Sequence, residues 1–352
     1  MRCSTAQLTH SSSFCTVLSI EARRLTRQIQ AIRGCLIFLV LFVSPAILSA
    51  QAWLFPPGEG TVAISYQDVY VRNHAFAEGV TLDRGHTLSH VLNADVDYSL
   101  TRKLAVRIAM PYVTARYRGP SPHPTVNDDG KYHGTFQDYS FDLRYNLSNG
   151  PVVVTPFFNA VIPSHGYEYF AHSAIGKDVH EYHVGTNLGR RMDPILPEAY
   201  IQARYSYAFV SRVLGIKPNR SNAEVQIGYF VKPGLSVMGT LQGAYTHGGV
   251  DLRLDVPSLG ITPEQWRVHD QIARDNILDA GGGLVYGLTP SVEVFASVAR
   301  SVAGRNTHLH TSVITVGFSR TFGSGLKEKG QSSLAGAPAP RKALVCTCAR
   351  TK

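Results

Sequence analysis

The sequence predicts an all-β fold, a twelve-stranded antiparallel transmembrane β-barrel of the bacterial outer membrane. Three observations predict this fold. Segments of about ten residues that alternate between apolar and polar recur along most of the chain, as they do in membrane-spanning strands. The links between these segments are short and long in turn. A late segment, Thr311–Phe322, has one apolar face and ends at an aromatic residue.

The first residues have the organisation of a secretory signal peptide. Residues 1–34 are polar and basic, the apolar run Cys35–Leu48 is fourteen residues long, and Ala50-Gln51-Ala52 follows as a small-x-small site. Fourteen residues are too few to cross a bilayer as a helix, which requires about 20. We therefore predict a signal peptide over residues 1–52, cleaved before Trp53, in preference to a retained N-terminal anchor.

The basic residues in excess lie outside the predicted barrel. The formal net charge is +9, of which residues 1–52 contribute five Arg and one Glu, and residues 323–352 contribute six Lys or Arg and one Glu. The segment between them is neutral, so the basic composition does not indicate nucleic acid as a partner. All five cysteines also lie in the two end segments, which excludes a disulfide framework or a cysteine-based metal site in the centre.

Five segments show the alternation most clearly and are predicted to be strands. Each has an apolar face and a polar face: Leu92–Leu100, Leu104–Tyr112, Phe141–Leu147, Ile201–Phe209 and Val225–Val231. A soluble β-sandwich would alternate too, but its dry core would not accept the Asp, Glu and Arg residues of the polar faces without a partner for each. The apolar faces end in Tyr and Phe, as aromatic girdles do. This combination favours a membrane barrel.

The connections predict the topology. Short turns are expected at Leu100–Lys103, Ser148–Pro151, Met192–Pro197, Lys232–Gly234 and Thr289–Pro290, and long links at Ala77–Gly85, Gly119–Gly134, Ser164–Asp178, Arg212–Asn219 and Gly249–Ala273, with a shorter one near Gly304. Bacterial barrels have an even number of strands, short periplasmic turns and long outer loops. We therefore expect twelve strands, the first over Thr61–Tyr70, with both barrel ends periplasmic. The first and last strands must pair, because an open strand edge in lipid is prohibitive.

The segment from Thr311 is predicted to be the twelfth strand. It resembles the terminal strand that the barrel-assembly machinery reads, ending at the aromatic Phe322, so this machinery is one expected partner. Outer-membrane lipid is the other expected partner of the barrel. Residues 324–352 are rich in Gly, Ala, Pro, Ser and Lys, a composition that predicts a disordered periplasmic tail. The expected organisation is a signal peptide over 1–52, a barrel over 53–323 and a tail over 324–352.

Four segments of the sequence together resemble a known family. They are WLFPPGEGTVAISYQ, LNADVDYSLTRKLAVRIAMPYV, LDAGGGLVYGLTPSVEVFASVARSVAGRN and VITVGFSRTF, and they look like outer-membrane barrels of the "MetA-pathway of phenol degradation" type. The resemblance covers about residues 53–323 and rests on fold-level patterns. It implies passive transport of small solutes of hydrophobic or aromatic character, and it transfers no catalytic residue.

Alternation predicts which polar residues point into the barrel. They are Asn93, Asp95, Asp97, Arg107, Asp138, Asp142, Arg144, Glu181, His183, Gln202, Arg204, Glu224, Gln226, Asp279 and Glu293. Acidic residues outnumber basic ones in this set. Rings of charge set the ion selectivity of pores, but the same residues paired with each other would fill a barrel of this width. The sequence leaves both a narrow channel and a closed structural barrel open.

A lipid-acting, phospholipase-like barrel is the competing function. His310 and Ser312 would share a strand face, as a base and a nucleophile, but only Asn306 is available as a third group and no oxyanion donor is evident. The HEYH segment, His180–His183, differs from the zinc motif HExxH because its histidines are three apart. We therefore predict that the protein is not an enzyme and that it has neither a cofactor nor a metal site.

Overall fold

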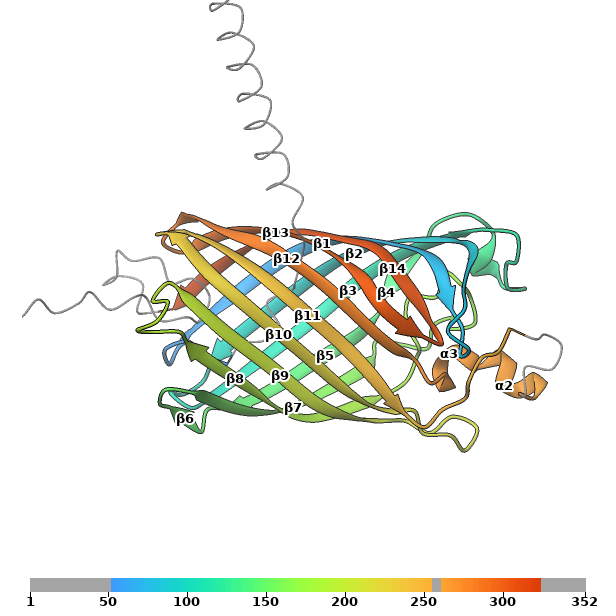
Figure 1. The fold of residues 1–352 in the computed structure, drawn as a ribbon, viewed down its shortest axis with the longest axis horizontal. Coiled ribbons are helices and arrows are strands. Elements are labelled where there is room, and N and C mark those ends of the chain that lie inside the picture. Colours follow the sequence, from blue (N-terminus) through green and yellow to red (C-terminus); the bar gives the residue numbers. More distant parts are fainter. Residues whose placement is uncertain (1–51, 255–260, 324–352) are drawn as a thin grey trace, which may run out of the picture. The chain divides into compact units, whose positions relative to one another are not determined.

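The computed structural model describes residues 52–254 and 261–323, which form a closed antiparallel barrel of twelve strands (Figure 1). The barrel closes because β1 (Glu59–Ala75) pairs with both β2 (Thr81–Ser99) and β14 (Thr307–Gly323). This pairing leaves no free strand edge, as lipid requires. The predicted fold class is confirmed. The predicted tail and all but the last residue of the predicted signal peptide lie outside the described residues.

One of the twelve strands is interrupted, so the chain has more strand segments than strands. The remaining segments are β3 (Leu104–Arg118), β4 (His133–Phe136), β5 (Asp138–Tyr145), β6 (Ser148–Asn149), β7 (Val153–Pro163), β8 (Glu181–Arg191), β9 (Ala199–Val210), β10 (Asn219–Lys232), β11 (Leu235–His247), β12 (Asn276–Thr289) and β13 (Val292–Arg305). Both β4 and β5 pair with β3, and β6 pairs with β7. These three segments make up the fourth strand.

Short turns and long loops lie at opposite ends of the barrel, as predicted. The long loops include residues 119–132, which contain the 3₁₀ turn Val126–Asp128, and residues 164–180. The loop from β11 to β12 contains α2 (Pro263–Arg267) and α3 (His269–Ile272), which Figure 1 shows at this end. No helix within 52–254 and 261–323 is long and apolar enough to span a membrane.

Two of the predicted outer links are tight because the strands run further than their alternation indicates. Residues 76–80 alone join β1 to β2, and Asn306 alone joins β13 to β14. Asn306 adopts a positive φ of 57°, a conformation that asparagine tolerates better than most residues. The extensions follow strand irregularities near Val71, where the period of two is broken and sequence patterning stops predicting a strand.

The outer surface of the barrel is apolar. Leu92, Phe141 and Ile227 are 52%, 42% and 58% exposed, and all three project from outward positions of their strands. An apolar surface continued over all the strands is unfavourable in water and suits a bilayer. At the turn end, the ring of Phe322 stacks on Tyr98 with 6.0 Å between centroids, in the position of an aromatic girdle.

Candidate functional site

The predicted inner-face residues are all buried or half-buried, and some, such as Asp142 and Glu224, alternate with exposed apolar neighbours. Asp97, Asp142, Arg144, Gln202, Glu224, Gln226 and Glu293 are buried, and Asn93, Asp95, Arg107, Asp138, Glu181, His183, Arg204 and Asp279 are half-buried. They lie on β2, β3, β5, β8, β9, β10, β12 and β13. The structure therefore gathers these polar side chains from eight strands inside one barrel.

Ion pairs join the charged side chains of β2, β3 and β5. Arg107 Nη2 lies 2.5 Å from Asp95 Oδ2. Arg144 pairs with Asp97, and Arg144 Nε lies 3.7 Å from Asp142 Oδ1. The side chains of Asp97 and Arg144 are each only 3% exposed. Charges buried to this extent require such partners, so this part of the lumen is filled by a charged network.

Arg204 extends this network from β5 to β9. From β9, its Nη2 donates to Asp142 Oδ2 on β5 at 2.7 Å, and so crosses the two intervening strands. Its Nη1 donates to Asn187 at 3.1 Å, and its guanidinium lies 3.5 Å from the centroid of the Phe157 ring. Glu224 lies opposite Arg204 in the β9–β10 register, with one buried oxygen that has no hydrogen-bond partner among the described residues.

A second polar group lies towards the loop end. Glu181 pairs with Arg220 of β10, and His183 Nε2 lies 3.2 Å from Glu181 Oε2. The hydroxyl of Tyr167, in the 164–180 loop, donates to Asp138. Burial, followed by the adjacent Asp138 carboxylate, raises the pKa of Tyr167 above its usual value. Tyr167 therefore stays protonated and attaches the loop to the barrel wall.

The wall formed by β11 to β14 and β1 has a different lining. Its inward positions carry mostly small side chains, among them Ala63, Ser65, Thr240, Gly281, Gly283, Ser297, Ala299, Thr315 and Ser319. Leu241 and Tyr245 project outward from odd-numbered positions of β11, so Gln242, at an even-numbered position, points inward. Gln242 is nevertheless exposed. On this wall water therefore reaches Gln242, whereas Ser65, Ser297, Thr315 and Ser319 are buried, and Met238, Val285 and Phe295 pack together in a buried cluster.

The segment that precedes β1 enters the barrel at the turn end. The amide of Ala52 donates to Gln202 Oε1 at 2.9 Å, and Thr155 Oγ1 donates to the Ala52 carbonyl at 2.6 Å. The ring of Trp53 meets Tyr200 edge to face at 6.2 Å and packs with it in one apolar cluster. Trp53 remains after the predicted cleavage before residue 53, and its ring narrows the turn end of the lumen. Sequence patterning did not predict it, because residues 52–58 precede any alternation.

The structure separates the two residues of the hypothetical lipase site. The β1–β14 register pairs Tyr70 with Ser312 and Val71 with His310, so Thr311 is an extra, bulged residue. A bulge reverses the alternation, which places His310 and Ser312 on opposite faces and corrects the prediction of a shared face. His310 Nδ1 instead contacts Asp279 Oδ2 at 2.9 Å.

Aromatic and imidazole rings gather where the long loops meet the barrel, in a group that we call the mouth cluster. It contains His74, His123, Asp128, His172, His269 and His308. Ring centroids lie 4.3 Å apart for His123 and His172, and 5.5 Å apart for His123 and His269. Trp266 stacks on His269 at 4.4 Å. The sequence did not predict this cluster, because its members come from separate loops and strand ends.

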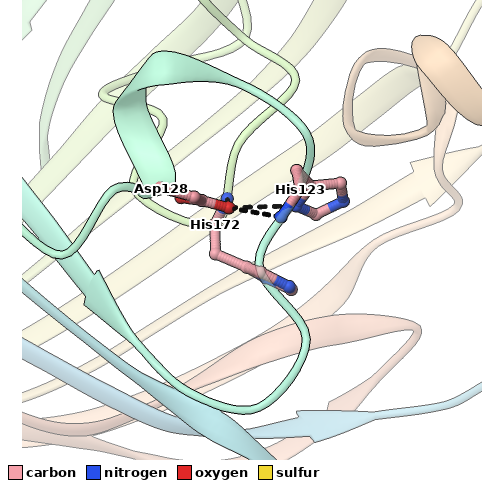
Figure 2. Close-up of side chains that lie close together, drawn as sticks. All are labelled: His123, Asp128 and His172. Atoms are coloured by element: carbon pink, nitrogen blue, oxygen red, sulfur yellow. Dashed lines mark hydrogen bonds and ion pairs between the residues drawn. The ribbon is translucent and has the colours of Figure 1, made fainter.

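Asp128 joins the two loops that supply His123 and His172 (Figure 2). Its Oδ2 accepts the backbone N–H groups of His123 and His172 at 2.9 and 3.0 Å, and its Oδ1 accepts the N–H and the hydroxyl of Ser173. Burial opposes ionisation here, but these donors and the His123 side chain hold the pKa of Asp128 well below its usual value. Burial, aided by His123 and His308, lowers the pKa of His172 to about 4.

Comparisons with known proteins place the fold and leave the family open. No protein-family model and no curated protein matches the chain. A solved structure of the COG4313 outer membrane channel from Pseudomonas putida F1 is similar, with a TM-score of 0.60 and 13% identity over 79% of this chain and 100% of that one. The shared fold is an outer-membrane β-barrel.

Two porins give weaker matches that carry no argument of their own. The NanC porin has a TM-score of 0.41 and 9% identity, over 75% of this chain and 99% of that one. The KdgM porin in complex with disordered oligogalacturonate has a TM-score of 0.38 and 9% identity, over 74% and 99%. At these identities, function must be argued from the residues of this chain.

Proposed function

We propose that the protein is an outer-membrane channel for the passive movement of small solutes, without a cofactor or covalent chemistry. The observation that carries this proposal is the uneven lining of the lumen. Charged side chains fill the side formed by β2 to β10, whereas Gln242 stays exposed beside the small side chains of β11 to β14. A lumen that water enters at Gln242, and that charged side chains line on its other side, has the character of a selective pore.

The solutes that suit this path are small, because the Trp53 segment narrows one end and the loops cover the other. For their chemistry, we adopt the character implied by the phenol-degradation-type resemblance, hydrophobic or aromatic molecules. The rings of Trp266 and Phe170 at the mouth support this choice, since aromatic faces bind aromatic solutes by offset or edge contacts.

Conductance of the purified protein in a planar bilayer tests the channel. The wild type should conduct, and Asp95→Asn/Asp97→Asn should lower its cation preference, because the variant leaves Arg107 and Arg144 in excess in the lumen. The matched control is Asp68→Asn, which neutralises an acid on an outward position of β1 next to His90. Its selectivity should equal that of the wild type.

The same preparation tests the two alternatives. If neither the wild type nor the variants conduct, the ion pairs belong to a closed structural barrel. Phospholipid hydrolysis that Ser312→Ala abolishes would instead establish a lipid-acting enzyme. We expect no such hydrolysis, because the bulge at Thr311 keeps His310 and Ser312 on opposite faces.

We further propose the cellular setting that this function requires. The leader would be cleaved before Trp53, and the strand ending at Phe322 would be the contact of the barrel-assembly machinery. Outer-membrane lipid would surround the apolar surface, and the tail after residue 323 would be periplasmic. Added protease should cut the tail in permeabilised cells only. Cleavage in intact cells would mean that the barrel is inserted with the opposite orientation.

A further inference from the structure

We propose that His123, Asp128 and His172 bind a divalent transition-metal ion, with Zn²⁺ as the probe, and that the ion fastens the 119–132 loop to the 164–180 loop. One nitrogen of each imidazole and one oxygen of the carboxylate all lie within 4.8 Å of one another (Figure 2). Two imidazoles and a carboxylate suit Zn²⁺ or its first-row neighbours better than Mg²⁺ or Ca²⁺. This proposal does not depend on which solute the barrel conducts.

The spacing of His123 and Asp128 already matches a metal site. His123 Nδ1 lies 3.3 Å from Asp128 Oδ2. Two ligand atoms on a tetrahedral zinc, with bonds of about 2.0 to 2.1 Å, are separated by about 3.3 Å. The third donor lies further out, so binding requires the His172 ring to turn towards the other two. His172 is only partly buried, which leaves room for that turn.

The surroundings prepare these side chains as ligands. His172 Nε2 lies 3.0 Å from the carbonyl oxygen of Ser121. A carbonyl can only accept, so Nε2 carries the hydrogen and Nδ1 keeps its lone pair. This bond selects the tautomer in which Nδ1 is available to a metal, and the turn of the ring towards the other two ligands would break it. The hydrogen bonds from both loops hold Asp128 in place.

Further imidazoles adjoin the three proposed ligands. His269 Nδ1 donates to the Trp266 carbonyl at 2.7 Å, and its Nε2 lies 3.4 Å from Asp270 Oδ1. The His269 ring lies over that of His123. His74, linked to His172 through the ring of His308, is only 8% exposed, and its Nδ1 has no hydrogen-bond partner among the described residues. His74 thus contacts His308 and not the three proposed ligands, so it belongs to the surroundings of the site.

The competing explanation is that the rings only pack and Asp128 only caps the loops. The double variant His123→Phe/His172→Phe distinguishes the two explanations, because phenylalanine keeps ring stacking and removes the nitrogens. The matched control is His180→Phe, in the same loop as His172 but exposed. If heat-modifiable migration shows that the double variant does not fold, His172→Gln replaces it.

Isothermal titration calorimetry tests the binding. ZnCl₂ is titrated into the full chain in detergent, after EDTA has removed any bound metal. We expect one Zn²⁺ per chain with an affinity that falls at least tenfold in the double variant and is unchanged in His180→Phe. Zn²⁺ should also slow tryptic cleavage at Lys131 and Lys177, which lie in the two loops, and should do so only where the ligands are present. Equal Zn²⁺ affinity in the wild type and the double variant, or no binding by either, would overturn the proposal.

Discussion

Replacing Asp142 with Asn tests whether the charged side of the lumen is a connected network. The Asp142 side chain is 2% exposed and lies 2.7 Å from Arg204 and 3.7 Å from Arg144. Removal of one partner from a buried ion pair costs about 3–5 kcal/mol, because the other charge is left uncompensated. Arg204 keeps its bond to Asn187 and its contact with Phe157. We therefore expect the low end of that range, about 3 kcal/mol.

The assay is urea unfolding of the barrel in detergent, followed by tryptophan fluorescence and heat-modifiable migration. The set comprises Asp142→Asn, Arg204→Gln and the double variant. Because the two residues contact each other, the double variant should lose less stability than the sum of the single losses, with an interaction energy of about 0.5–3 kcal/mol. Asp129→Asn, in an exposed loop pair with His133, should unfold like the wild type.

Additive losses would refute this reasoning. If each single variant loses less than about 1 kcal/mol, as exposed pairs do, and the double variant loses the sum, Asp142 and Arg204 do not meet across the lumen. The two charges would then be solvated separately on their own strands.

Three further predictions follow from particular contacts. Trp53→Ala should raise single-channel conductance, because it removes the ring that packs on Tyr200 at the turn end. Trp53→Phe should raise the conductance less. An unchanged conductance in both variants would mean that the segment does not narrow the pore. Gln242→Trp should lower conductance, whereas Leu241→Trp, on the adjacent outward position, should not; equal effects would contradict the water-accessible wall. Tyr167→Phe should speed proteolysis of the 164–180 loop, because it removes the hydroxyl that bonds Asp138 and Asp178, and a rate equal to that of Tyr169→Phe would count against that attachment.

The strand pattern was predictable because successive residues of a barrel strand face the lipid and the lumen in turn. In β5, exposed Phe141 and Leu143 alternate with buried Asp142 and Arg144. This alternation can be recognised directly in the amino-acid sequence. The sequence also predicted the ends at which the short turns and the long loops lie, although two of the outer links, residues 76–80 and Asn306, are tight. The closure of β1 on β14 followed from the requirement that no strand edge be left open in lipid.

Contacts that depend on three dimensions were not predictable. The reach of Arg204 across two strands to Asp142 depends on barrel curvature, which alternation does not encode. The bulge at Thr311 has no sequence signal, so the prediction of a shared face for His310 and Ser312 was wrong. The mouth cluster combines His123, His172 and His269 from the loop regions with His74 and His308 at the ends of β1 and β14. Nothing in the sequence indicated that these histidines would meet.

Swelling of proteoliposomes tests the central claim, that the barrel conducts small solutes, most directly. Liposomes containing the wild-type protein, with an impermeant osmolyte inside, are diluted into isotonic solutions of small neutral solutes that include an aromatic one. The account predicts swelling that depends on the protein, falls as solute size increases, and is slower with Gln242→Trp than with Leu241→Trp. Swelling no faster than in protein-free liposomes, for every solute, would contradict it.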